Sequence, residues 1–342
     1  MRPVCLALAF VAMLLTAAGP PTKVRVSFDL ITEKGFPITG SQQWHKTLGD
    51  LGVTSLRIHS GTGSEEAAIE NEGTEQRPSY KVTGILKADN TLHLPGGKFS
   101  SRDAAAIRKW IAELGDQGPE GVTQAKSAFG LLPKQLAAVH KDLTRTVRES
   151  TKGQNASKAV EAIGKTLDAP LVLDRTAPAA LAEVTIEEDL SGLSSGTALA
   201  AILRPAGLVL QPERPSGGKL QYRIGPPRAA EESWPIGWKT KDAPRETLPT
   251  LFEQINVEIK DAELPEVLRS IQERLEVPFL FDHNALAMHN IDIAKVAATV
   301  PGKRLSYSQI LQKVLLQARL KYELRKDEAG KPLIWITSIK PT

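Results

Sequence analysis

The second half of this 342-residue chain contains one pattern of apolar residues twice. The segment 160–174 matches the segment 268–282 at a shift of 108 residues. Further along, the segment 199–224 matches 311–336 at a shift of 112. A constant shift within each part, with four residues inserted between the parts, indicates a duplicated structural unit. Because both copies must then fold alike, this repeat restricts the fold more than the composition does.

Each copy is expected to contain a helix, an apolar strand, a second helix and a hairpin. In the second copy, a strand of alternating pattern at 255–259 precedes an amphipathic helix at 268–275. The helix ends before Pro278, which begins the apolar strand ProPheLeuPheAsp. A helix at 308–316 then leads into a hairpin between Leu320 and Ile336.

The first block of the chain has the pattern of a separate small α+β domain. Strands alternate with helices that end at glycines, and the acidic, glycine-rich stretch between residues 60 and 79 is expected to be a loop. The expected elements are a strand at 24–30, a helix from Thr39 or Ser41 to Gly52, a strand at 53–58, a hairpin at 80–94 and a helix from Ser100 or Ser101 to Gly115.

The sequence therefore predicts an α+β protein with an N-terminal α+β domain followed by two tandem βαβ-type modules. We expect a short amphipathic helix in the connector, a first strand near 143–151 in the first module, and an extended linker rich in proline and tryptophan. The predicted divisions are a signal peptide at 1–19, the N-terminal domain at 22–115, a connector at 116–142, modules at 143–226 and 253–340, and the linker at 227–252.

The N-terminus has the layout of a secretory signal peptide. Arg2 precedes an uncharged apolar run at 4–18, which is followed by small residues and prolines. Cys5 is the only cysteine, so the exported chain would have no disulfide, thiolate metal site or cysteine nucleophile. We expect a periplasmic or equivalent extracytoplasmic protein, with no membrane span after removal of the signal.

The overall charge does not indicate a nucleic-acid partner. A formal charge of +4 and a pI near 9.0 are a mild excess over 342 residues. This excess is well short of the clustered basic face expected of a nucleic-acid binder. The start of the first copy, from Lys134 to Lys165, is locally basic, which leaves an acidic partner or an anionic envelope surface as an alternative to a solvated surface. Mixed-charge, solvated surfaces are the favoured interpretation.

The second copy resembles a known family of envelope modules. The segments NVEIKDAELPEVL at 256–268, LEVPFLFD at 275–282 and LSYSQIL at 305–311 are similar to the STN domain, the short N-terminal module of bacterial secretins and TonB-dependent receptors. The resemblance covers residues 253–339, and more loosely 143–226. It implies two STN-like modules that act as periplasmic interaction domains, without enzymatic activity and without a cofactor.

The polar motifs of the chain are not typical of an active site. The histidines show no HxxxH or HExxH spacing. Asp282 and His283 lie near His289, so a loose metal site is conceivable, but an aspartate that caps the following turn is the favoured role. The glycine-rich segment 60–64 is a poor phosphate cradle, because Glu65 follows it directly. We nominate no catalytic, cofactor-binding or metal-binding residue.

The favoured function is a non-enzymatic protein–protein interaction or scaffold role with an envelope partner. The candidate interaction residues are Trp234, Trp238, Asp282 and His283. Packing of the two tryptophans onto a neighbouring domain is favoured over an exposed pair. The alternative is an envelope glycan- or ligand-binding protein, or a hydrolase, with its site in the N-terminal domain between the loop 60–79 and the hairpin 86–98.

Overall fold

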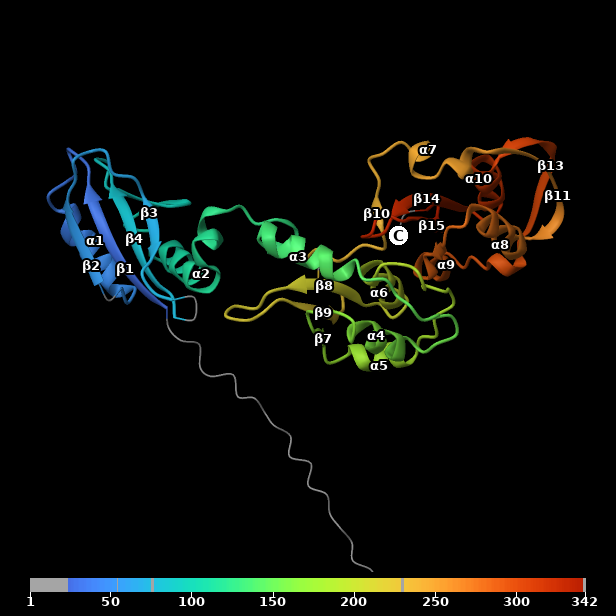
Figure 1. Ribbon diagram of the computed structural model, residues 1–342, viewed down its shortest axis with the longest axis horizontal. Helices are drawn as coiled ribbons and strands as arrows, with labels where there is room; N and C mark the ends of the chain where they lie inside the picture. The colour runs from blue at the N-terminus through green and yellow to red at the C-terminus, as the bar shows by residue number, and fades with distance from the viewer. Residues whose placement is uncertain (1–23, 54, 75–76, 229–230, 341–342) are drawn as a thin grey trace, which may run out of the picture. The chain divides into compact units, whose positions relative to one another are not determined.

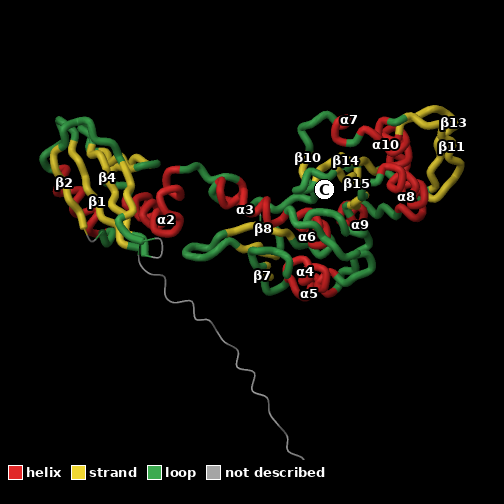
Figure 2. The backbone as a smooth tube through the Cα atoms, in the orientation of Figure 1, coloured by secondary structure: helices red, strands yellow, loops and turns green. Residues whose placement is uncertain are grey.

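The chain has an α+β fold with mixed sheets, as a computed structural model shows (Figures 1 and 2). The structure describes residues 24–53, 55–74, 77–228 and 231–340. The chain divides into two compact units, Met1–Ala125 and Lys126–Thr342. The predicted signal peptide at 1–19, together with Cys5, lies outside the described residues.

The first unit is a mixed sheet with the strand order β2-β1-β4-β5-β6, and β3 pairs with β4. Strand β1 runs parallel to both β2 and β4, and side chains of α1 and α2 complete the buried core of this unit. The elements are β1 (Arg25–Thr32), α1 (Gly40–Asp50), β2 (Ser55–Ser60), β3 (Ala68–Asn71), β4 (Ser79–Leu86), β5 (Thr91–Leu94), β6 (Gly97–Ser100) and α2 (Ala104–Thr123).

The first unit differs from the prediction in two segments. The stretch expected to be a loop contains β3, whose Ile69 packs against the core and whose Glu70 lies opposite Lys81. The last helix does not end at Gly115 but extends to Thr123, with a break in the helical geometry at Gly118 (φ 69°). Burial of Val122 against the core outweighs the low helix propensity of these glycines, which is about 1 kcal/mol each.

The second unit begins with a helix and continues with the first copy of the repeat. Its three-stranded sheet has the order β7-β9-β8, with β7 parallel and β8 antiparallel to β9. The elements are η1 (Ala128–Gly130), α3 (Pro133–Leu143), α4 (Ala156–Gly164), β7 (Leu171–Leu173), α5 (Ala177–Ala182), α6 (Ser195–Leu203), β8 (Val209–Glu213) and β9 (Gln221–Gly225). The helix predicted in the connector is α3.

The second copy follows the linker and has a sheet of the order β10-β14-β15-β12, together with a separate two-stranded ribbon of β11 and β13. The elements are β10 (Trp238–Lys239), α7 (Pro244–Thr247), η2 (Pro249–Phe252), β11 (Gln254–Glu263), α8 (Leu264–Leu275), β12 (Phe279–Phe281), α9 (His283–Met288), η3 (Ile293–Lys295), β13 (Ala297–Ser306), α10 (Tyr307–Gln317), β14 (Leu320–Lys326) and β15 (Pro332–Ser338).

The two copies pair their strands in the same register. With shifts of 108 and 112 residues, the strand partners of the first copy coincide with those of the second. Even the two isolated bridges of the first copy fall on the two end pairs of the β11–β13 ribbon. The equivalent pairs are Leu171–Tyr222 and Phe279–Ile334, Leu210–Ile224 and Tyr322–Ile336, Thr146–Ser194 and Gln254–Ser306, and Asn155–Thr185 and Glu263–Ala297. The repeat in the sequence is thus a repeat of topology.

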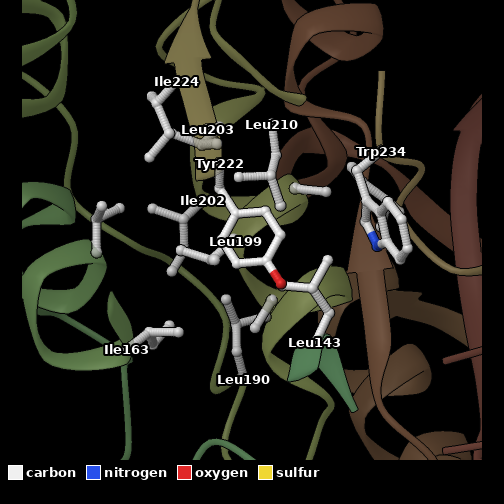
Figure 3. Close-up of a cluster of buried hydrophobic side chains, with 14 of the residues drawn as sticks. Leu143, Ile163, Leu190, Leu199, Ile202, Leu203, Leu210, Tyr222, Ile224 and Trp234 are labelled. Carbon is white, nitrogen blue, oxygen red and sulfur yellow. The ribbon is translucent and has the colours of Figure 1, made fainter. Parts of the chain in front are cut away.

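The core of the first copy is built around Tyr222, which is fully buried at the centre of β9. Figure 3 shows its ring among Leu199, Ile202 and Leu210. The Tyr222 hydroxyl donates to Oδ2 of Asp142 at 2.8 Å, so this polar atom is satisfied inside an apolar cluster. Burial and this carboxylate both raise the pKa of Tyr222, which stays a neutral donor.

Two leucines of α10 allow a matched test of the core. Leu311 is fully buried in the core of the second copy, whereas Leu316 is 63% exposed. We expect Leu311→Ala to lower the free energy of unfolding by about 3 kcal/mol, because the lost methyl groups leave a cavity. Leu316→Ala should change it by less than about 0.5 kcal/mol. Urea unfolding followed by circular dichroism measures both values, and equal effects would contradict this assignment of the core.

Candidate functional site

The two tryptophans of the linker pack inside the second unit. Trp234 is only 3% exposed, and its ring stacks with Phe129 at 5.5 Å between centroids. Trp238 meets it edge-on at 5.1 Å, and the ring of His140 contacts both indoles. Burial lowers the pKa of His140, which favours the neutral imidazole in this aromatic cluster. The two tryptophans therefore pack against a neighbouring part of the chain, as favoured from the sequence, and do not form an exposed pair.

Two acidic residues of the hairpin turn in the second copy bind the N-terminus of α6 in the first copy. Oδ2 of Asp327 accepts from the backbone N–H and the hydroxyl of Ser194, at 3.0 and 2.9 Å. Oε2 of Glu328 accepts from the backbone N–H and the hydroxyl of Thr197, at 3.2 and 2.9 Å. Carboxylates at a helix N-terminus are favourable because they satisfy free N–H groups and face the positive end of the helix dipole.

Glu328 also accepts a hydrogen bond from the indole Nε1 of Trp234, at 2.5 Å. Burial raises the pKa of Glu328 in spite of these donors. Sequence reasoning missed Asp327 and Glu328. A signal was present, because the equivalent positions of the first copy are Pro215 and Ser216, so the acidic pair belongs to one copy only.

Asp282 and His283 also join the two copies. The carboxylate of Asp282 accepts two hydrogen bonds from Arg204 of the first copy, from Nε at 2.7 Å and from Nη2 at 2.8 Å. It also caps α9 by accepting from the N–H of Ala285, which is the role favoured from the sequence. Burial acts to raise the pKa of Asp282, but the pairing with Arg204 outweighs it and the pKa is lowered.

His283 contacts an acidic loop segment of the first copy. Its Nε2 lies 2.5 Å from Oε1 of Glu188, and this hydrogen bond raises the pKa of His283. The four candidate interaction residues are therefore occupied by contacts within the second unit. In the first copy, the equivalent of Asp282 is Asp174, which pairs with Nη1 of Arg223 at 2.9 Å. Within the described ranges, no three His, Cys, Asp or Glu side chains gather to hold a metal.

The glycine-rich segment of the first unit is closed by its own acidic residue. The carboxylate of Glu65 accepts from the backbone N–H groups of Thr62 and Gly63, at 2.7 and 2.8 Å. These hydrogen bonds hold the pKa of Glu65 at about 2. The N–H groups that a phosphate would need are therefore engaged by a carboxylate of the same loop.

The outer edge of β14 is one of the unpaired strand edges of this unit, and it lies beside two hollows. Strand β10 pairs with β14 only at Lys326 and Arg325, after which the chain turns away at Thr240–Asp242 (Figure 1). Among the described residues, no strand pairs with the outer side of Leu320–Leu324. An unpaired edge presents backbone N–H and C=O groups that can pair with an added strand.

Two hollows flank this edge. One is an apolar groove of about 590 Å³, lined by Leu316 of α10, Phe252 of η2, and Leu320, Tyr322 and Leu324 of β14 itself. The other, of about 360 Å³, lies on the opposite face of β14, at the junction with the first copy. Charged side chains of β14 and Trp335 line it on one side, and residues 208–210 of the first copy and 233–236 of the linker line it on the other. Residue Lys321 borders both hollows, so they meet at the edge of the strand.

The equivalent edge of the first copy is covered by the chain itself. The backbone N–H of Trp234 donates to the carbonyl of Leu210 in β8, at 2.7 Å. Leu210 is fully buried, whereas its equivalent in the second copy, Tyr322, is partly exposed. The linker thus contacts the middle of the edge strand in the first copy, whereas in the second copy it pairs only with the end of β14, at Arg325 and Lys326.

Comparison of the chain with protein-family models, with curated proteins and with solved structures finds no match. The helices within residues 24–53, 55–74, 77–228 and 231–340 are all too short or too polar to cross a lipid bilayer.

The contact between His283 and Glu188 predicts a pH-dependent junction. The pKa of His283 is raised above 6.5 in the folded chain. The contact with Glu188 therefore stabilises the fold fully below pH 6.5, and this stabilisation is lost as the pH rises through the folded-state pKa. We expect His283→Gln to cost about 1 kcal/mol at about pH 5.5 and much less at about pH 8.5, by urea unfolding. The exposed His45 of the first unit gives the control His45→Gln. An equal cost at both pH values would exclude an ionic contact.

The pairing of Arg204 with Asp282 predicts a second loss of stability. Removal of the guanidinium leaves a carboxylate that is 3% exposed without its cationic partner. We expect Arg204→Met to lower the free energy of unfolding by about 2 kcal/mol. This is less than the usual cost of breaking a fully buried ion pair, because Arg204 itself reaches solvent. The matched control is Arg269→Met on α8, whose side chain is 67% exposed. If the two variants unfold at the same urea concentration, the pair of Arg204 and Asp282 does not contribute to the stability of the unit.

Proposed function

We propose that this chain is a non-enzymatic interaction protein of the bacterial cell envelope, whose second copy binds an extended segment of a partner at the outer edge of β14. The observation that carries the proposal is the contrast between two equivalent strands. In the first copy, the linker lies on the edge of β8 through the Trp234–Leu210 hydrogen bond. In the second copy, the equivalent edge at Leu320–Leu324 borders a groove.

Strand addition suits such an edge for a physical reason. Backbone groups on the outer side of Leu320–Leu324 would gain hydrogen bonds from a partner, while side chains of the added strand fill hollows on either face. The rigid attachment of the second copy to the first, through Arg204, Asp282 and Glu328, holds the edge in one place. A preformed edge loses less conformational entropy on binding than a mobile one.

Export to the periplasm belongs to the same proposal. It rests on the apolar run at 4–18 and on the resemblance of residues 253–339 to STN domains. The partner is then another protein of the envelope. An envelope glycan-binding protein or a hydrolase is the second candidate. In the first unit, Glu65 occupies the N–H groups of its own loop, so this loop offers no free anion site to such a function.

A photocrosslinking experiment tests the proposal in the exporting bacterium. A photoreactive amino acid replaces Leu316 in the groove, or Val172 of β7 as a control that is also exposed. We expect adducts from position 316 that mass spectrometry maps to one short extended segment of an envelope protein. Position 172 should give none of these adducts, because Val172 lines neither of the two hollows beside β14.

The same adduct from both positions, or none from position 316, would refute binding at β14. Hydrogen exchange provides a second measurement on the purified chain. A bound partner segment should slow the hydrogen exchange of backbone amides within Leu320–Leu324. Exchange within Val209–Glu213 should not change, since the linker already covers the edge of β8.

A further inference from the structure

We infer that the segment bound at β14 has alternating apolar and acidic side chains. This inference rests on the proposed function and names the chemistry of the partner. Successive residues of a strand point to opposite faces of a sheet, so an added strand places every second side chain on each face. The two hollows beside β14 lie on opposite faces and differ in chemistry.

Side chains of β14 point alternately to the two faces of the sheet, and each face borders one of the hollows. Leu320, Tyr322 and Leu324 line the apolar groove. Glu323 and Arg325 line the charged hollow, together with Trp335 of the neighbouring strand. Glu323 pairs directly with Trp335, which confirms that these residues share one face.

The apolar groove suits aliphatic or aromatic side chains. Leu316 is 63% exposed and Ile339 is 45% exposed, although both residues border the groove. Phe252 closes it from the side of the linker, with the guanidinium of Arg245 above its ring at 5.6 Å. Covering these surfaces would remove apolar area from water, and each fully buried aliphatic side chain contributes about 2 kcal/mol to such a contact.

The charged hollow carries a net positive charge. Four cations line it against two carboxylates, and both carboxylates are engaged: Asp282 by Arg204, and Glu323 by Arg325. Lys321 and Lys340 are the remaining cations, and neither forms an ion pair in the described part of the chain. An acidic side chain of an added strand would meet these two ammonium groups.

The first copy serves as an internal comparison. The positions equivalent to Lys321, Glu323 and Arg325 are Val209, Gln211 and Glu213, which carry no cation. The segment seated on that edge, SerTrpProIle at 233–236, carries no charge. The acidic residues just before it, Glu231 and Glu232, accept hydrogen bonds from Arg223 and from the backbone N–H of Phe129. Among these equivalent positions, the cations Lys321 and Arg325 thus occur in the second copy alone, on the strand whose edge is open.

Synthetic peptides test the inference on the full exported chain. The probes are capped heptapeptides in which isoleucine alternates with glutamate, or alternates with lysine, or is grouped into one block with the same glutamates. We expect the alternating isoleucine–glutamate peptide to bind about tenfold more tightly than either of the others, measured by calorimetry. The advantage over the lysine peptide should shrink between about 50 mM and about 500 mM salt.

Charge reversal at the edge gives the decisive variant. Lys321→Glu should weaken binding of the glutamate peptide by about tenfold and strengthen binding of the lysine peptide. Lys303→Glu is the matched control and should change neither, because Lys303 is an exposed lysine of the separate β11–β13 ribbon and lines neither hollow. Urea midpoints of both variants verify that each remains folded.

The inference fails if the lysine peptide or the block peptide binds as tightly as the alternating one, or if Lys321→Glu has no effect. Failure of the proposed function has a different signature, the absence of a mapped adduct from position 316. A mapped adduct whose segment lacks the alternation would keep the function and overturn the inferred chemistry.

Discussion

The second unit depends on the burial of one face of the second copy's sheet in the core of the first copy. Leu280, Leu333 and Trp335 belong to the same buried cluster as Leu199 and Tyr222. The indole of Trp335 lies near two guanidinium groups, those of Arg204 at 5.8 Å and Arg325 at 5.2 Å. Each guanidinium is in turn paired with a carboxylate, so the polar groups at this contact are satisfied and the aromatic ring is not left against water.

The path of the linker across this contact explains why the two copies, which share one topology, differ at their edge strands. The shared registers show that the backbone template is the same in both copies. In the first copy, the linker crosses the edge of β8 before it reaches β14. The linker then pairs with only two residues of β14 and turns away, with Asp242 bound to Lys326 at 2.6 Å. One segment cannot cover both edges fully, and the second copy is the one left partly open.

Most helices and strands of the repeat were predictable from its sequence because they depend on local patterns. The strand expected near 143–151 was wrong, since this segment forms only an isolated bridge at Thr146. Alternating apolar residues and the prolines before β7 and β12 define strands and helices without knowledge of the tertiary fold. The role of Asp282 as a cap was predictable for the same reason, since the residue that it caps, Ala285, is three positions away. In the first unit, the extension of α2 beyond Gly115 was not predictable, because it depends on the burial of Val122 against distant strands.

The junction between the copies could not be predicted from one sequence. Asp327 binds Ser194 across 133 positions, and Arg204 binds Asp282 across 78, so no local pattern connects the partners. The open edge was equally hidden, because its openness depends on where the linker turns. What the sequence did contain was the difference between the copies: acidic residues at 327–328 and a lysine at 321, each without a counterpart in the first copy. In a duplicated fold, residues of the common core follow the template. Three of the charged positions at which the copies differ lie at contacts outside this template, Asp327 and Glu328 at the junction and Lys321 at the open edge.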